Sequence, residues 1–315
     1  MNNIPTLDDI QSAAERIEKH INRTPVLTNS TIDTMVDANL YFKCENFQKV
    51  GAFKARGALN AVLGLSEEEA SKGVATHSSG NHAAALALAA RIRGVPAYIV
   101  MPDNAPRVKK EAVSAYGAEI TYCTATLKDR EDTLAKVVER TGAVFIPPFN
   151  DYRIITGQAT VALELFEEVA DLDIVMAPVG GGGLLSGTAL SALYISPSTS
   201  VIAAEPEGAD DAWHSFRAGK IIPSEKPETI ADGLLTSLGD LTFDIIKRYV
   251  DDIVTIDDEA IISTTRLIME RMKIVVEPSA AVPLATLLGK RLDVSGKRVG
   301  IILSGGNIDL DNFPF

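Results

Sequence analysis

The chain has 315 residues, which is enough for two domains around a large buried core. Its 46% hydrophobic and 23% charged content is typical of a globular enzyme, and its net charge of −12 argues against binding to nucleic acid or to an anionic membrane surface. Cys44 and Cys123 lack the spacing of a metal or redox pair, so we expect two reduced thiols. The first residues lack the layout of a signal peptide and no apolar run is long enough to cross a bilayer, so we expect a cytoplasmic protein.

Helical and strand-like stretches alternate along the chain. Thr6 and Asp9 have the spacing of a capping box, and the apolar residues after them repeat at helical spacing as far as Ile21. Further helices are expected at Lys54–Leu63, Asn81–Arg93, Arg107–Tyr116, Arg130–Arg140, Ile154–Ala170, Leu184–Leu193 and Asp258–Met272. Strands are expected at Leu40–Cys44, Gly73–His77, Ala97–Met101, Glu119–Cys123, Val144–Pro147, Ile174–Pro178, Val201–Glu205, Ile253–Ile256 and Arg298–Leu303. This alternation predicts an α/β fold, with a parallel sheet flanked by helices.

The middle of the chain predicts an inserted domain. Four β–α alternations lie between residues 73 and 148, and Pro147-Pro148 closes the stretch. We therefore expect a small domain at residues 73–148, inserted in a large domain formed by residues 1–72 and 149–315. A site between two such domains suits a ligand that must be shielded from water.

Lys54 indicates a chemistry more directly than any other residue. It lies in the run GAFKARG, residues 51–57, among small and apolar neighbours. Desolvation disfavours the ammonium form, and only the free amine attacks an aldehyde, so Lys54 is a candidate for a covalent bond to an aldehyde cofactor. Phe53 beside it can pack against the flat ring of such a cofactor. For a single lysine the alternative is a solvated helix residue.

Four consecutive glycines, residues 180–183, predict a phosphate site. They follow a strand-like run and precede the helix expected from Leu184. Strand, glycine loop and helix together aim backbone N–H groups at a phosphate, with help from the helix N-terminus. A tight turn without a ligand is the alternative, but each glycine costs chain entropy and four exceed what a turn needs. The P-loop and G-x-G-x-x-G patterns both fail here.

Two more polar segments lie at the ends of expected strands. The run SSGNH, residues 78–82, opens a helix, where an asparagine can donate to a phenolate, free N–H groups can hold a carboxylate and a serine can exchange a proton. A plain helix N-cap is the alternative. The run SGGN, residues 304–307, follows the last strand, and the hydroxyl of Ser304 can pair with a pyridine nitrogen. The alternative there is a turn that ends a strand.

Glu205, Ala209 and Asp211 lie in the acidic run EPEGADD, residues 205–211. Two carboxylates and a backbone carbonyl can bind a hard divalent cation through oxygen. In so acidic a chain, the alternative is a solvated acidic loop.

Together these motifs resemble the fold-type II pyridoxal phosphate (PLP) enzymes, in the group of serine racemases, serine/threonine dehydratases and 3-hydroxyaspartate dehydratases. The resemblance covers nearly the whole chain, in the segments FKCENFQ (42–48), FKARGALN (53–60), THSSGNH (76–82), GQ (157–158), the glycine loop, TIADG (229–233), 271–278 and SGGNID (304–309). It implies a tryptophan synthase β-like α/β fold, with two domains of parallel-rich sheets flanked by helices.

The resemblance implies a role for each motif. Lys54 would bond to the cofactor and act as the base on one face of the substrate, and Ser79 would be the acid/base on the other face. The cofactor would also contact Phe53, Asn81 at its phenolic oxygen, Ser304 at its ring nitrogen, and Gly180, Gly181, Gly182 and Gly183 at its phosphate. The substrate carboxylate pocket would be lined by Ser78, Ser79, Asn81 and His82. A divalent cation, Mg²⁺ or else Mn²⁺ or Ca²⁺, would bind Glu205, the Ala209 carbonyl and Asp211.

Two residues bear on the substrate. Arg130 falls where racemase-like members place an arginine facing the distal end of the substrate, and a guanidinium there suits a second carboxylate. The alternative is a surface arginine at a mixed-charge helix start. Phe149 stands where some serine racemases carry an asparagine, which resembles the dehydratase pattern and argues against racemisation as the main activity.

We therefore expect a PLP-dependent ammonia-lyase that converts 3-hydroxyaspartate to oxaloacetate and ammonia, with serine or threonine as the alternative substrate. The main rival is a serine racemase with serine/threonine dehydratase activity. A non-catalytic ligand sensor and a nicotinamide-dependent dehydrogenase are further rivals, and the second lacks a dinucleotide fingerprint. The resemblance also implies a homodimer and a nucleotide effector.

Overall fold

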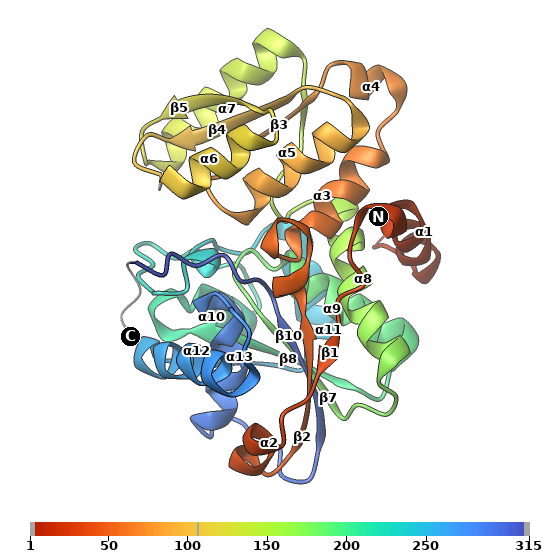
Figure 1. The fold of residues 1–315 in the computed structure, drawn as a ribbon, viewed down its shortest axis with the longest axis vertical. Coiled ribbons are helices and arrows are strands. Elements are labelled where there is room, and N and C mark those ends of the chain that lie inside the picture. The colour runs from red at the N-terminus through yellow and green to blue at the C-terminus, as the bar shows by residue number, and fades with distance from the viewer. Residues whose placement is uncertain (1–3, 106, 312–315) are drawn as a thin grey trace.

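The strands form two separate sheets in the computed structural model, which describes residues 4–105 and 107–311 (Figure 1). The larger sheet has the order β1-β2-β10-β7-β8-β9, and its pairs are parallel except for β1 with β2. Its strands are β1 (Val26–Leu27), β2 (Asn39–Cys44), β7 (Ile174–Pro178), β8 (Ser200–Pro206), β9 (Asp252–Ile256) and β10 (Arg298–Leu303).

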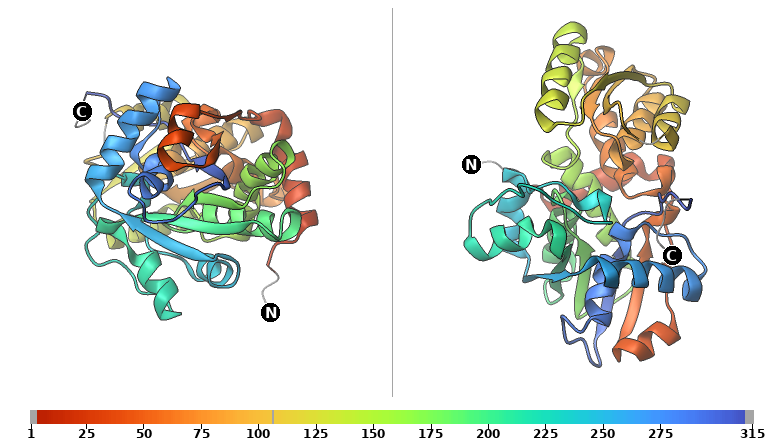
Figure 2. Two further views of the ribbon diagram at one scale, coloured as in Figure 1. Left: turned by 90° about the horizontal axis from the view of Figure 1, so that it is seen from below. Right: turned by 90° about the vertical axis from the view of Figure 1, so that its left-hand side faces the viewer.

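The smaller sheet is parallel throughout and has the order β5-β4-β3-β6. Its strands are β3 (Val74–His77), β4 (Ala97–Pro102), β5 (Glu119–Cys123) and β6 (Val144–Phe145). All four come from the middle of the chain, and their part of the molecule stacks on the larger part along the long axis (Figures 1 and 2). The domain boundaries at residues 73 and 148 stay a prediction.

Helices cover both sheets. The α-helices are α1 (Leu7–Ile17), α2 (Ser30–Val36), α3 (Lys54–Leu63), α4 (Glu67–Ser71), α5 (Asn81–Arg93), α6 (Arg107–Ala115), α7 (Leu127–Thr141), α8 (Tyr152–Glu168), α9 (Gly183–Ile195), α10 (Asp211–Ala218), α11 (Asp240–Tyr249), α12 (Asp258–Met272) and α13 (Pro278–Leu288). Short 3₁₀ turns lie at η1 (Glu18–His20), η2 (Glu45–Phe47), η3 (Lys49–Gly51), η4 (Glu207–Ala209) and η5 (Asp232–Leu234). No helix in the described part of the chain is long and apolar enough to cross a membrane.

The larger sheet is apolar on both faces because it is buried on both faces. Along β7, Val175 and Ala177 join the core formed with α8, α9 and α11, whereas Ile174 and Met176 join the core formed with α12 and α13. Such unbroken apolar strands are typical of parallel sheets covered by helices on each side. The expected α/β class is confirmed.

Helix α3 lies between the two parts of the molecule, where it packs against both α5 and α8. Its Arg56 is fully buried and forms a fork with each of two carboxylates, Glu45 after β2 and Glu164 on α8, at 2.7–2.8 Å. Lys43 donates to Glu164 at 2.6 Å. These bonds fix the start of α3, and therefore Lys54, relative to β2 and α8.

Most expected elements are found, with differences at their ends. The capping box of Thr6 and Asp9 is present, but the first helix stops at Ile17 and a 3₁₀ turn takes the chain toward Ile21. Helix α7 begins three residues before Arg130, because Thr126 caps it by accepting from the N–H of Asp129. The expectations did not include β1, α2, α4, α10, α11 and α13.

Candidate active site

The predicted site segments follow the carboxyl ends of parallel strands. The glycine loop follows β7, Ser304 follows β10 and Ser78 follows β3. Because loops at the carboxyl ends of parallel strands share one edge of a sheet, the first two are neighbours. The chain before Lys54 joins them, since Ala52 bridges to Gly305 and the Phe53 N–H donates to the Ser304 carbonyl at 3.0 Å.

Lys54 has the properties of a reactive amine. It is the first residue of α3, and its Nζ donates to the carbonyl of Pro148 at 2.8 Å and lies 5.1 Å from the centroid of the Phe53 ring. Burial lowers the pKa of Lys54 to about 8, and the carboxylate of Glu277 opposes part of that change. At neutral pH about a tenth of the molecules therefore carry Lys54 as a neutral, nucleophilic amine, far more than for an ordinary lysine.

Ser304 presents a hydroxyl to the site. Only 2% of its surface is exposed, and its Oγ is buried without a hydrogen-bond partner among the described residues. A buried hydroxyl without a partner costs free energy, so it marks a place where a ligand atom is expected. A ring nitrogen is a suitable partner because the hydroxyl can donate to it.

The glycine loop is built to approach a ligand closely. Gly180, Gly181 and Gly182 are buried, and no hydrogen bond among the described residues is donated by their N–H groups. A Cβ added to Gly181 would overlap the ring of Phe149, the residue after the acceptor of the Lys54 hydrogen bond. Three free donors ahead of helix α9 fit a phosphate group.

Asn81 is held by two residues that the sequence reasoning did not assign to the site, Glu277 and Asn307. Its amide donates to the Glu277 carboxylate at 3.0–3.1 Å, and its Oδ1 accepts from Asn307 Nδ2 at 2.9 Å. The backbone N–H of Asn307 also donates to Glu277, at 3.3 Å. In the sequence, Glu277 directly precedes Pro278 at the start of an apolar helix. This position is equally typical of an ordinary helix start, so it did not indicate a role in the site.

His82 lies in the first turn of α5 as a neutral ring. Its Nε2 contacts the carbonyl of Ile146 at 3.0 Å, and a carbonyl only accepts, so Nε2 carries the hydrogen. Burial, and then the charge of Lys54, lowers the pKa of His82 to about 3. It therefore offers no positive charge to a substrate carboxylate. Ser78 and Ser79, both half-buried, precede this turn, whose free N–H groups are the other source of positive potential.

Arg130 lies in the first turn of α7 and is half-buried. Its charge acts on His77, the last residue of β3 directly before Ser78, and on Cys123 at the end of β5. It is therefore near the edge of the small sheet that carries the SSGNH run. Its Nε is buried without a hydrogen-bond partner in the described part of the chain.

The predicted cation ligands lie at the carboxyl end of β8. The Glu205 carboxylate is fully buried and accepts from the backbone N–H groups of Ala212 and Trp213 at 2.9 and 2.8 Å. Asp211 is 3% exposed, and neither of its carboxyl oxygens has a described partner in full hydrogen-bond geometry, although the backbone of Leu238 and the side chain of Ser237 lie close enough to lower its pKa in part. Ala209 is buried at the end of the turn between them.

The ionised form of both carboxyl groups is disfavoured by burial. Burial raises the pKa of Glu205 to about 9, and it also raises the pKa of Asp211. The described residues include no cluster of three or more His, Cys, Asp or Glu side chains that can hold a metal. A cation here would therefore need the Ala209 carbonyl and water to complete its shell.

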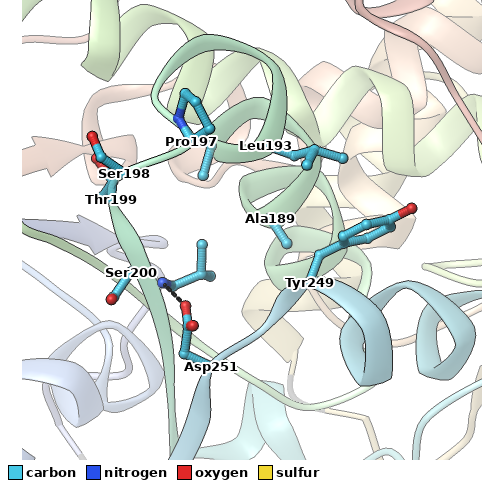
Figure 3. A pocket seen from close by; sticks show the side chains of 10 residues that line it. Ala189, Leu193, Pro197, Ser198, Thr199, Ser200, Tyr249 and Asp251 are labelled. Atoms are coloured by element: carbon cyan, nitrogen blue, oxygen red, sulfur yellow. Dashed lines mark hydrogen bonds between the residues drawn. The ribbon is translucent and has the colours of Figure 1, made fainter.

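A separate pocket lies at the opposite edge of the large sheet (Figure 3). It has a volume of about 190 Å³ and is lined by residues such as Leu193, Tyr249 and Asp251. It adjoins Ser200, where β8 begins, whereas the candidate site lies where the strands end. Asp251 accepts there from the N–H of Val201 at 2.7 Å, which secures the strand.

A half-buried amine, an unpartnered hydroxyl, free loop N–H groups and the surrounding two-part α/β fold are together compatible with a site for a phosphorylated aromatic aldehyde. Comparison with known proteins agrees. The family model described as "Pyridoxal-phosphate dependent enzyme" matches residues 17–305. The chain therefore belongs to the pyridoxal phosphate-dependent enzymes, and its fold is that of the fold-type II members.

Individual relatives narrow the comparison. The chain is 53% identical to the β-hydroxyaspartate dehydratase of Paracoccus denitrificans over 312 residues, which cover 99% of each chain. It is 50% identical to the serine racemase of Dictyostelium discoideum, over 98% of this chain and 96% of that protein. The solved structure of maize serine racemase superimposes with a TM-score of 0.96 at 49% identity, covering 98% of this chain and 95% of the other.

Proposed function

We propose that this protein is a PLP-dependent ammonia-lyase for a small β-hydroxy amino acid, and that 3-hydroxyaspartate is its substrate, giving oxaloacetate and ammonia. The named dehydratase relative supports the reaction type. The observation that carries the choice of substrate is Arg130, a half-buried guanidinium beside the substrate loop whose Nε has no partner among the described residues. A dicarboxylic substrate supplies the second carboxylate that such a group binds.

Lys54, Ser304, Asn81 and the glycine loop would hold the cofactor, which when bound supplies an attachment point for the substrate amine and a sink for electrons from Cα. The neutral Nζ of Lys54 takes the proton from the substrate Cα, for which its lowered pKa suits it. The free N–H groups at the start of α5 orient the α-carboxylate. Loss of the α-proton and the β-hydroxyl removes water, and hydrolysis of the enamine product gives the 2-oxo acid and ammonia.

The substrate is tested by a keto-acid assay over the 3-hydroxyaspartate isomers, both serine enantiomers and threonine, with Arg130→Met as the variant. We expect one hydroxyaspartate isomer to be the best substrate, and Arg130→Met to raise its KM about tenfold or more while changing serine turnover little. Arg140→Met, on the same helix but paired with Glu119 at the surface, is the matched control. If serine or threonine outperforms every hydroxyaspartate isomer, the substrate proposal is wrong.

Serine racemisation is the second candidate, favoured by the racemase relative and by Ser79 at the start of α5. Racemisation needs proton exchange on both faces of Cα, so Ser79→Ala should abolish it while sparing elimination from the L-isomer. Equal loss of both activities would refute the two-face assignment. Phe149, whose ring lies against Gly181, follows the dehydratase pattern of the family resemblance, and this favours elimination as the main reaction.

We also propose that Glu205, Asp211 and the Ala209 carbonyl bind a divalent cation, with Mg²⁺ the first choice. What supports this is a pair of buried carboxyl groups with raised pKa values, of which Asp211 has two oxygens without a hydrogen-bond partner among the described residues. A homodimer, a nucleotide effector and a cytoplasmic location stay predictions of the family resemblance.

A further inference from the structure

The start of helix α11 packs directly against the glycine loop. Thr242 is fully buried, and its Oγ1 hydroxyl has two carbonyl acceptors within reach, that of Gly181 at 2.9 Å and that of Gly239 at 3.1 Å. We take the shorter contact, to Gly181, as the hydrogen bond. The same Oγ1 accepts from the N–H of Gly239 at 3.0 Å, which fixes the rotamer of the hydroxyl-bearing side chain. A Cβ added to Gly182 would lie 2.8–2.9 Å from side-chain atoms of Leu238, Thr242 and Ile246, so the loop backbone touches the helix with no room for a side chain.

This contact determines which way one peptide of the loop faces. The described residues contain no cis peptide bond, and in a trans peptide the C=O and the following N–H point in opposite directions. Because Thr242 holds the Gly181 carbonyl against α11, the Gly182 N–H points away from α11. A loop of glycines has wide conformational freedom, so without this bond the same peptide can rotate and turn its carbonyl toward the ligand.

We propose that Thr242 is a positioning residue that sets the Gly181–Gly182 peptide so that its N–H, not its carbonyl, faces the cofactor phosphate. This rests on the proposed assignment of the glycine loop as the phosphate site. Two further bonds hold α11 in place: Asn150 accepts from the N–H of Leu241 at 3.0 Å, and the Ser186 hydroxyl donates to the Thr242 carbonyl at 3.3 Å. Asn150 follows Phe149, so the loop, α11 and the segment beside Lys54 form one packed unit.

The test compares the binding of PLP and of pyridoxal, which lacks the phosphate, to enzyme freed of cofactor. Thr242→Val keeps the shape and removes the donor, and we expect it to weaken PLP binding about five- to tenfold while leaving pyridoxal binding within about twofold. Thr242→Ser restores the donor and should bind PLP within about twofold of wild type. The phosphorus-31 NMR signal of bound PLP should shift in Thr242→Val but not in Thr242→Ser.

Two further variants keep the test decisive. Thr265→Val is the matched control, since Thr265 is equally buried but donates only to the carbonyl of Ile261 in its own helix. Thr242→Cys, which retains a weak donor, is expected between serine and valine and serves if the valine variant does not fold.

Equal weakening of PLP and pyridoxal by the Thr242 variants, or no weakening of either, would overturn the proposal. A wild-type enzyme that binds pyridoxal as tightly as PLP would instead overturn the assignment of the loop as a phosphate site. The two failures are therefore distinguishable.

Discussion

Two clusters of buried carboxyl groups in this protein solve the same electrostatic problem in different ways. Glu45 and Glu164 share the guanidinium of Arg56. Burial alone would raise the pKa of Glu164, but the hydrogen bonds and charges of Arg56 and Lys43 outweigh burial and lower the pKa below its usual value. Glu205 and Asp211 are equally buried, but their pKa values are raised. The first cluster is therefore neutralised from within the chain, and the second is not.

The difference distinguishes a structural ion-pair cluster from the proposed cation site. All the N–H groups of Arg56 point at carboxylates or at the hydroxyl of Thr160, so nothing in that cluster is left for a ligand. Asp211 instead keeps two oxygens without partners among the described residues. Buried charge left uncompensated costs several kcal/mol, so the second cluster requires a proton or a cation from solution.

The largest effect is expected from removing the internal cation. Arg56→Met leaves Glu45 buried without a cation and should lower the free energy of unfolding by about 3–5 kcal/mol, measured by urea denaturation. The control is Arg266→Met, whose arginine pairs with Glu270 on the surface of α12 and should cost less than about 1 kcal/mol. If the two variants lose similar amounts of unfolding free energy, the buried ion pairs of Arg56 contribute no more to stability than the surface pair of Arg266.

The second prediction concerns the uncompensated pair. Mg²⁺ at about 100 times its Kd should stabilise the wild type by about 2.7 kcal/mol, and Glu205→Gln should abolish this gain. Glu207→Gln, which changes an exposed neighbour paired with Arg291, is the control and should leave the gain intact.

The same pair predicts a pH dependence with a definite sign. The folded-state pKa of Glu205 is raised to about 9, so its contribution to stability is present below the unfolded pKa and is lost as pH rises toward 9. Mg²⁺ replaces the proton, so the rise in Tm on adding Mg²⁺ should grow from about pH 6 to about pH 9. A rise in Tm that is the same in Glu205→Gln, or that shrinks with pH, would contradict the cation site.

The sequence predicted what depends on local pattern and missed what depends on packing. Lys54, the glycine loop and Ser304 stood out because their residue types are unusual at the ends of helices and strands. The structure joins the segments of Lys54 and Ser304 through the Ala52–Gly305 bridge, and the glycine loop contacts Phe149, which follows the Pro148 acceptor of Lys54. Glu277 was missed because its role depends on Asn81, almost 200 residues earlier in the chain, and no spacing rule connects them.

Helix α11 shows the same limit. It begins at Asp240, and its first turn carries Thr242, whose contact with Gly181 joins residues far apart in the sequence. The one local signal was the spacing of Gly239 and Thr242, a weak form of the capping pattern that marked the first helix. A glycine N-cap lacks the side-chain oxygen that makes such a pattern recognisable, so the helix was not predicted.

The smallest predicted effect concerns Lys54, a half-buried charge that has one nearby carboxylate where Arg56 has two. Its pKa is lowered to about 8 by burial, while the charge of Glu277 raises it. The reaction of cofactor-free enzyme with PLP should therefore accelerate about tenfold per pH unit below this value and level off above it, because only the neutral amine attacks. Glu277→Gln removes the opposing charge, so the midpoint should move to lower pH, as followed by the absorbance of bound cofactor.

The control, Glu270→Gln on the surface of α12, should leave the midpoint unchanged. A shift to higher pH in Glu277→Gln would mean that the carboxylate affects Lys54 mainly by holding Asn81 in place, and not by its charge.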